Sequence, residues 1–355
     1  MVEPNFRSTT SCELILKGLK DNLRKKRIPY SVTDTITDLG FCNEKIFMFI
    51  VSTNQSFISK ATAECQAKKI HPIIISLQSL DSISGIYSSV TPSIEHSMLR
   101  IMKFLKNREK TTPALYGISL NSAPDIARKN CFLQKHILST DEEDVFYNQT
   151  GLDDCFEKFF ANVNKYDCVI CTNNYAAIHL INALNAREIF LDDFIIISYG
   201  KTLLATKFYP EIIHVYVPNE SLGKTAIMVL EQLQNNTDIL HINMSVKCAI
   251  SNESGAVFEP ITENNNIYEE STSDIFYEDP HIQNMLLVEK LLSSCDSTDI
   301  LILDLVISGA SYDEISNKSF LSHSAVKYRV KNMIQSCNCS TKSQFVQFMK
   351  MYMQK

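Results

Sequence analysis

Basic side chains without acidic neighbours mark the end of this chain. Between positions 318 and 355 the sequence has no aspartate or glutamate, whereas the whole chain of 355 residues carries a formal net charge of −6. The basic residues of this segment are Lys318, Lys327, Arg329, Lys331, Lys342, Lys350 and Lys355. Such segregated positive charge binds polyanions, because basic side chains neutralise phosphates and release their counterions. The competing interpretation is a solvated helix face with a chance run of lysines.

Two short helices are predicted just before and within this basic segment. Positions 299–308 (DILILDLVIS) predict a helix with leucine and isoleucine on one side, and Gly309 ends it. Ser311 caps a second helix at 312–318, because Glu314 follows it at the spacing of a capping box.

A third helix follows after a tight connection. Phe320 and Leu321 form the connection, and Ser322 caps a helix predicted at 325–336 (AVKYRVKNMIQS). Two short helices joined in this way have the geometry of a helix-turn-helix, in which the second helix enters the major groove of DNA. This arrangement favours a DNA-binding surface over a chance run of lysines.

Positions 297–352 resemble the LuxR-type helix-turn-helix. The matching residues are Asp299, Ile302-Leu303, Gly309-Ala310-Ser311, Glu314-Ile315-Ser316, Leu321-Ser322, Ala325-Val326-Lys327 and Cys339-Ser340-Thr341-Lys342. The sequence departs from the family at Asp296-Ser297, where Thr-Pro is common, and at Lys331-Asn332.

This resemblance implies which side chains bind double-stranded DNA. Lys327 and Arg329 are the first candidates for phosphate or base contacts. The full candidate set is Lys327, Arg329, Tyr328, Lys331, Ser322 and Ser324. Phosphate contacts fix the register of a protein on DNA, and base contacts decide the sequence. We expect a homodimer, because one such module buries little area and a two-fold pair reads two half-sites.

The remaining reactive residues predict no metal site, no cofactor and no enzyme. The eleven cysteines have no repeated spacing, which is typical of reduced and partly buried thiols. Cys168 and Cys171 lie in a predicted strand and face opposite sides of it. Cys337 and Cys339 lack a second pair of ligands for a tetrahedral site.

Common catalytic motifs also fail to match. The sequence has no glycine-rich phosphate loop, no Gly-x-Ser-x-Gly elbow and no His-Glu-x-x-His motif. The scattered histidines are His71, His96, His136 and His214. Two alternatives stay open: a protein-interaction adaptor with a small-molecule sensor domain, and, less favoured, an α/β enzyme.

The longer N-terminal part alternates strand and helix patterns, which predicts an α/β fold with parallel sheets. Predicted strands lie at 45–51, 71–76, 114–119, 144–147, 167–171 and 193–198. Predicted helices lie at 14–26, 56–69, 98–105, 124–136, 153–163 and 176–185. No apolar stretch is long enough for a membrane span and no signal pattern begins the chain, so we expect a cytoplasmic protein.

This α/β part resembles the ligand-sensing domain of the lactose-repressor family, which is similar to type-1 periplasmic binding proteins. The closest stretch is 166–235, and Tyr116-Gly117-Ile118-Ser119 with Ser122, Asp125 and Arg128 is similar to the start of the second lobe. The resemblance implies two lobes joined by crossing strands, with a ligand in the cleft between them.

The same resemblance gives candidate ligand residues, which are Arg128, Asn173, Gly200, Lys201 and Thr10. Asn174 replaces the usual aspartate of the family. Ser198-Tyr199-Gly200-Lys201 replaces a Gly-Phe/Tyr-Asp-Asp turn, so a carboxylate that would accept hydrogen bonds from sugar hydroxyls is missing. This departure counts against a sugar, and Lys201 favours an anionic small-molecule effector if it faces the cleft.

Composition divides the chain into a sensor domain at 1–258, an acidic linker at 259–280 and a helix-turn-helix domain at 281–355. Lobe 1 is expected at about 1–111 and 219–245, and lobe 2 at about 112–218 and 246–258. Few residues precede the first turn, so the family's first strand is shortened or lost. Either this lobe has a trimmed edge, or the sequence begins later than that of the natural chain.

Together these patterns predict a ligand-responsive transcription regulator. Small-molecule binding between the sensor lobes would shift the placement of dimeric C-terminal modules on DNA. Relatives of the lactose repressor place DNA binding before the sensor, so their hinge mechanism does not carry over to this domain order.

Overall fold

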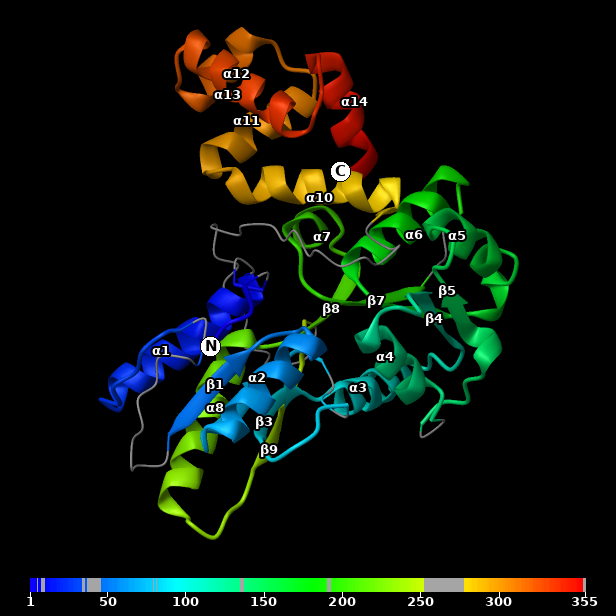
Figure 1. The fold of residues 1–355 in the computed structure, drawn as a ribbon. Coiled ribbons are helices and arrows are strands. Elements are labelled where there is room, and N and C mark those ends of the chain that lie inside the picture. The colour runs from blue at the N-terminus through cyan, green and yellow to red at the C-terminus, as the bar shows by residue number, and fades with distance from the viewer. Residues whose placement is uncertain are drawn as a thin grey trace.

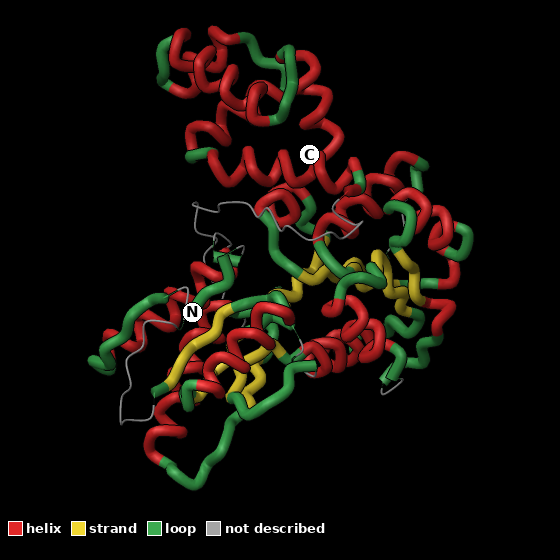
Figure 2. Tube along the Cα trace, in the orientation of Figure 1, coloured by secondary structure: helices red, strands yellow, loops and turns green. Residues whose placement is uncertain are grey.

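The computed structural model describes residues 1–4, 6–7, 10–33, 36, 46–78, 80, 82–134, 137–189, 193–251 and 278–353. Two α/β lobes, each built on its own sheet, carry a group of helices formed by the C-terminal residues (Figure 1). Among the described residues, strands occur in the two lobes only, and every regular element after residue 277 is a helix (Figure 2). The predicted combination of α/β lobes and a small all-α region is confirmed.

The first lobe contains four parallel strands. In spatial order they are β1 (Phe47–Val51), β2 (His71–Ile75), β3 (Ser88–Pro92) and β9 (Asn243–Val246). Ile73 and Ile75 of β2 pack with α1 (Thr10–Lys25) and α8 (Asn219–Asn235). Ile74 points to the other face, where it packs with α2 (Gln55–Ala67). Burial on both faces explains the continuous apolar run of this strand.

The second lobe contains six strands. Their spatial order is β10 (Ala249–Ile250), β8 (Ile212–Tyr216), β7 (Ile195–Tyr199), β6 (Cys168–Cys171), β4 (Pro113–Ile118) and β5 (Val145–Tyr147). All neighbours are parallel except β10 and β8. Because parallel strands end at the same edge, the loops after β4, β5, β6 and β7 meet there.

Helices cover both faces of the second sheet. One face packs with α3 (Ile94–Lys106) and α4 (Ala123–Phe132), and the other with α5 (Leu152–Phe160), α6 (Asn174–Ala186) and α7 (Leu203–Phe208). Short 3-10 helices lie at Glu142–Asp144 and Val163–Lys165. Cys168 and Cys171 enter different cores, as the strand period predicts, and burial raises the pKa of both thiols.

The start of the chain forms almost no strand. Val2 makes a single parallel bridge to Val51, and the backbone N–H of Glu3 donates to the Val51 carbonyl at 3.0 Å. The expected first strand is therefore shortened to one bridge beside β1.

The C-terminal part consists of α10 (Pro280–Ser294), α11 (Ser297–Ile307), α12 (Tyr312–Ser319), α13 (His323–Ser336) and α14 (Lys342–Tyr352). Their buried side chains and those of α5, α6 and α7 form one continuous apolar core. Most of the predicted acidic linker, 259–277, lies outside the described residues. Asp279 ends it as the N-cap of α10.

Among the described residues, no helix combines the length and the apolar character that a membrane crossing requires.

Candidate nucleic-acid interface and effector site

Three capping residues shape the candidate nucleic-acid interface. Ser311 and Glu314 form the predicted capping box at the start of α12, where the Ser311 amide donates to Glu314 Oε2 at 2.7 Å. Phe320 ends α12 in the left-handed conformation with φ of 55°. Ser322 then caps α13, since its Oγ accepts from the Ala325 amide at 3.2 Å. The chain thereby turns sharply between two short helices, as a helix-turn-helix requires.

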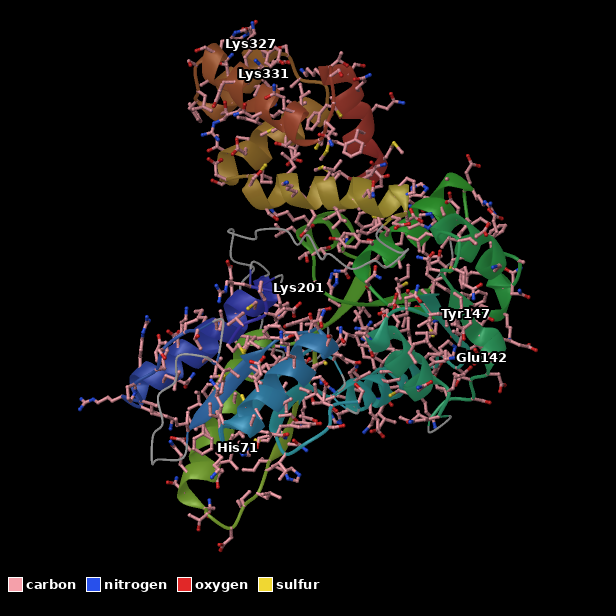
Figure 3. The ribbon with its side chains drawn as sticks, viewed as in Figure 1. His71, Glu142, Tyr147, Lys201, Lys327 and Lys331 are labelled. Atoms are coloured by element: carbon pink, nitrogen blue, oxygen red, sulfur yellow. The ribbon has the colours of Figure 1, made fainter. Side chains whose placement is uncertain are left out.

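Helix α13 has an apolar face and an opposite polar face. Its buried side chains recur at helical spacing and are Val326, Val330 and Met333, with Cys337 buried at the C-cap. Between its two ends, where His323 and Ser336 are also exposed, the exposed residues follow a stripe on the other side, and they are Ser324, Lys327, Tyr328, Lys331, Asn332 and Gln335. Lys327 and Lys331 lie at the end of the molecule remote from the two lobes (Figure 3). This stripe combines positive charge, amides and hydroxyls, which are the groups that contact phosphates and base edges.

Tyr312 supports the basic face from α12. The ammonium of Lys327 lies 5.8 Å from the Tyr312 ring centroid, and the ammonium of Lys342 lies 4.7 Å from it. Lys342 also donates to the Ala310 carbonyl at 3.1 Å. These contacts hold the ammonium groups of Lys327 and Lys342 beside the Tyr312 ring, at the start of α12.

Arg329 occupies a different environment from the one that the sequence predicts. Its guanidinium donates to Asp299 Oδ1 at 2.6 Å and to Asp296 Oδ2 at 3.0 Å. Its hydrogen bond to Asp299 raises the pKa of Arg329, and the bond to Asp296 adds to the rise. The two aspartates form the capping box of α11, so Arg329 ties α13 to the start of α11. These ion pairs hold the guanidinium against α11, whereas the sequence led us to expect an outward-facing side chain.

Ser322 and Ser324 lie at the start of α13. Both are exposed, and their hydroxyl oxygens are 3.1 Å apart. A helix start presents backbone N–H groups and a partial positive charge, so both serines are placed where a phosphate would approach.

The candidate effector site lies at the carboxyl edge of the second sheet. Gly200 follows β7 with φ of +103°, a conformation that favours glycine, and Lys201 follows it. Asn174, the first residue of α6, holds this loop when its amide is oriented to satisfy its neighbours. Its carbonyl oxygen then accepts from the amides of Lys201 at 3.1 Å and Thr202 at 2.8 Å. The ammonium of Lys201 lies 5.1 Å from the Tyr216 ring centroid.

Arg128 lies at the same edge, on α4. Its guanidinium donates to Asp125 Oδ1 at 2.6 Å and stacks over the Tyr199 ring, 4.4 Å from the centroid. Its buried Nε has no hydrogen-bond acceptor among the described residues. A buried N–H without an acceptor is costly, so a ligand oxygen at this point would relieve it.

The other predicted ligand residues have different surroundings. Asn173 is the N-cap of α6, and its side-chain oxygen accepts from the Ala176 amide at 3.0 Å. Thr10 begins α1, and its side chain lies outside the described residues. Asn173 therefore follows β6 at the same edge as Gly200 and Lys201, but its side-chain oxygen is already engaged in the helix cap.

His214, on β8, is a titratable group that lies next to this loop. Burial lowers the pKa of His214 to about 4, and the positive charge of Lys201 acts in the same direction. The imidazole is neutral at physiological pH, so it adds no charge beside Lys201.

A buried carboxylate of α10 binds the helix that follows the effector loop. Glu289 accepts from the backbone amides of Leu203 at 2.7 Å and Leu204 at 2.8 Å. Burial raises the pKa of Glu289, and the amides of Leu204 and Leu203 oppose that rise. Two buried side chains therefore bind four consecutive backbone amides. Asn174 binds those of residues 201 and 202, and Glu289 binds those of residues 203 and 204.

The end of α14 makes further contacts with the second lobe. The hydroxyl of Tyr209 donates to the Tyr352 carbonyl at 3.0 Å, and the amide of Asn182 donates to the Met351 carbonyl at 3.1 Å. Sequence patterns contain no signal for these contacts or for the hydrogen bonds of Glu289, because each pairs residues far apart in the chain. An acidic residue inside an apolar helix was the available sign at Glu289.

Solved structures of transcription regulators have a similar fold. A regulator from Lactobacillus plantarum is 13% identical with a TM-score of 0.51, and the match covers 68% of this chain and 94% of that one. The regulator CelR in complex with cellobiose is 11% identical with a TM-score of 0.50, covering 70% and 81%. A LacI-family regulator from Clostridium acetobutylicum is 20% identical with a TM-score of 0.49, covering 68% and 93%.

At these identities the comparison shows a similar fold and nothing more, and this conclusion rests on the first two structures. It confirms the expected two-lobed α/β architecture. No protein-family model and no curated protein matches the sequence.

Proposed function

We propose that this protein is a ligand-responsive transcription regulator whose C-terminal helices form a LuxR-type helix-turn-helix. The observation that carries the proposal is the exposed stripe of α13, where Lys327 and Lys331 lie one turn apart beside the capped turn from α12. An acidic protein gains little from such a basic face unless the face meets a polyanion.

Lys327 and Lys331 are the phosphate-binding side chains in this proposal, and Tyr328 and Ser324 share their stripe. Tyr328 is 67% exposed, which leaves its ring and hydroxyl available to a groove. Arg329 acts as a positioning residue, because its ion pairs with Asp296 and Asp299 orient α13 on α11. Ser322 fixes the start of the helix through its cap.

The effector in this proposal is a small anion that binds beside Gly200 and Lys201. Lys201 supplies a positive charge, and Arg128 supplies a buried N–H that lacks an acceptor. An oxygen-rich anion would satisfy both groups. The departure of this loop from the family's acidic turn supports an anion over a neutral sugar.

Coupling would run from the effector loop through α7 to α10. An effector that moves the amides of Lys201 and Thr202 also moves those of Leu203 and Leu204, to which Glu289 binds. Because α10 shares a core with α11, α13 and α14, a shift of α7 changes the placement of the DNA-binding stripe. A coupling free energy of about 1–3 kcal/mol would change DNA affinity roughly 5- to 150-fold.

A homodimer would place two such stripes on successive half-sites. A single module contacts few base pairs, and two-fold pairing doubles the contacts within one site. We therefore propose a dimeric DNA complex, which light scattering of the protein with and without a duplex would measure.

The experiment that tests the proposal measures retention of the full chain on duplex DNA as salt is raised. The expected result is tight binding at low salt that weakens linearly on a logarithmic scale.

The competing function is a protein-binding adaptor, which the 94% exposed Phe320 in the turn favours. An adaptor would show no salt-dependent retention on DNA, and that outcome would contradict the proposal.

A further inference from the structure

Two histidines and an aspartate meet where the second lobe contacts α10. Asp153 lies in the first turn of α5, His179 on α6 and His281 in the first turn of α10. Nε2 of His179 is 2.9 Å from Asp153 Oδ1, and Nε2 of His281 is 3.3 Å from Asp153 Oδ2. The potential ligand atoms of all three residues lie within 4.8 Å of one another.

We propose that these three side chains bind one transition-metal ion of the Zn²⁺ type. Two imidazoles and one carboxylate are the donor set that Zn²⁺ accepts, whereas Mg²⁺ and Ca²⁺ prefer oxygen ligands. Two ligand atoms on the same tetrahedral ion lie roughly 3.3 Å apart, given metal–ligand bonds of about 2.0 Å. The nitrogen–oxygen distances of this cluster are close to that separation, so modest side-chain rotations would admit the ion.

The surroundings of the cluster suit an ion with an open position. His179 is 5% exposed, and His281 packs edge-on against it with ring centroids 4.9 Å apart. Asp153 is 78% exposed, so an ion can reach the carboxylate from solvent. All three residues line a pocket of about 300 Å³, which leaves room for water at the remaining coordination position.

The ion would bind residues from two different parts of the fold. Asp153 and His179 belong to the second lobe, whereas His281 belongs to the C-terminal helices. One ion would therefore link the second lobe to the C-terminal helices at the start of α10, just over two helical turns before Glu289. The binding site itself does not depend on the proposed DNA-binding function.

The test uses the full chain after chelation and dialysis, titrated with ZnCl₂ by calorimetry. We expect one Zn²⁺ per chain, and at least a tenfold loss of affinity in His281→Ala. The matched control is His323→Ala, because His323 forms a surface pair with Asp313 at 3.6 Å outside the cluster. The control should bind Zn²⁺ as the wild type does.

Cysteines are the main competing ligands, and Co²⁺ separates the two possibilities. Binding at the proposed site gives d–d absorption without a thiolate-to-cobalt charge-transfer band. A charge-transfer band, equal affinity in wild type and His281→Ala, or no binding to the wild type would each overturn the proposal. If His281→Ala does not fold, Asp153→Asn provides the second variant, since its exposed side chain tolerates replacement, and it should lose affinity by a similar factor.

Discussion

The carboxylate of Glu289, on α10, lies 2.7 Å from the backbone nitrogen of Leu203, on α7, and both residues are buried. Leu203 begins the short helix that follows Gly200 and Lys201. Glu289 also accepts from the amide of Leu204, so one carboxylate connects the helix that follows the candidate effector loop to the first helix of the C-terminal group.

Replacing Glu289 should weaken the coupling between the candidate effector loop and the C-terminal helices. Glu289→Gln keeps the size of the side chain but offers one acceptor where two amides now bind, so a buried amide is left without a partner. We expect a loss of about 1–3 kcal/mol in the free energy of unfolding, measured by urea denaturation. Effector-dependent changes in DNA affinity should also become smaller. The exposed Glu211→Gln is the control, and an identical loss in both variants would contradict the coupling role.

Replacing the two lysines of α13 should weaken DNA binding without destabilising the fold. Lys327→Ala combined with Lys331→Ala removes two exposed charges, so the slope of log affinity against log salt should fall by about two. Fluorescence anisotropy with a labelled duplex measures this slope. Lys290→Ala, an exposed lysine of α10, should leave it unchanged.

Replacing Arg329 should lower the stability of the fold more than it lowers DNA affinity directly. Arg329→Gln removes the ion pairs to Asp296 and Asp299, and because the arginine side chain is 32% exposed we expect a loss of about 1 kcal/mol or less. A thermal melt at low and high salt measures this loss, which salt should reduce. Arg24→Gln, whose side chain is 69% exposed, should have no effect. A large loss of DNA affinity with an unchanged melting temperature would instead make Arg329 a direct contact.

Lys201 should determine the charge of the effector. Thermal-shift assays of the full chain with sugar phosphates, inorganic phosphate and neutral sugars should show stabilisation by anions only. Lys201→Ala should remove that stabilisation, and Lys60→Ala on α2 should retain it. Stabilisation by a neutral sugar in both variants would contradict the anionic assignment.

His214 should make the fold less stable in mild acid. In the unfolded chain a histidine titrates near 6.5, whereas burial lowers the pKa of folded His214 to about 4. Stability is therefore full above pH 6.5 and decreases as the pH falls toward 4, by about 3 kcal/mol in total. Urea denaturation across this range should show a flatter pH dependence in His214→Gln. The exposed His323→Gln should keep the wild-type dependence.

Local patterns predicted most of the architecture. The strands at β1, β2, β4, β6 and β7 coincide with apolar runs, and the caps Ser311 and Ser322 begin α12 and α13. The polar strand β3 (SSVTP) escaped prediction, because its hydroxyl side chains resemble those of a loop even though they are buried between neighbouring strands.

The candidate sites were less predictable than the elements. Lys327 and Lys331 are exposed one turn apart on α13. The sequence instead favours Lys327 and Arg329 as the first candidates on that helix. It could not show that Arg329 is held by two aspartates of α11, or that Glu289 reaches α7. Both are contacts between elements, and they depend on how the helices cross rather than on spacing along the chain.

Selection of duplexes from a random-sequence pool with the full-length protein measures whether the exposed stripe of α13 recognises a DNA sequence. The account predicts enrichment of one motif with two half-sites separated by about one helical turn, and loss of that enrichment in the Lys327→Ala, Lys331→Ala variant. A selected pool without any common motif, or the same motif selected by the double variant, would contradict it.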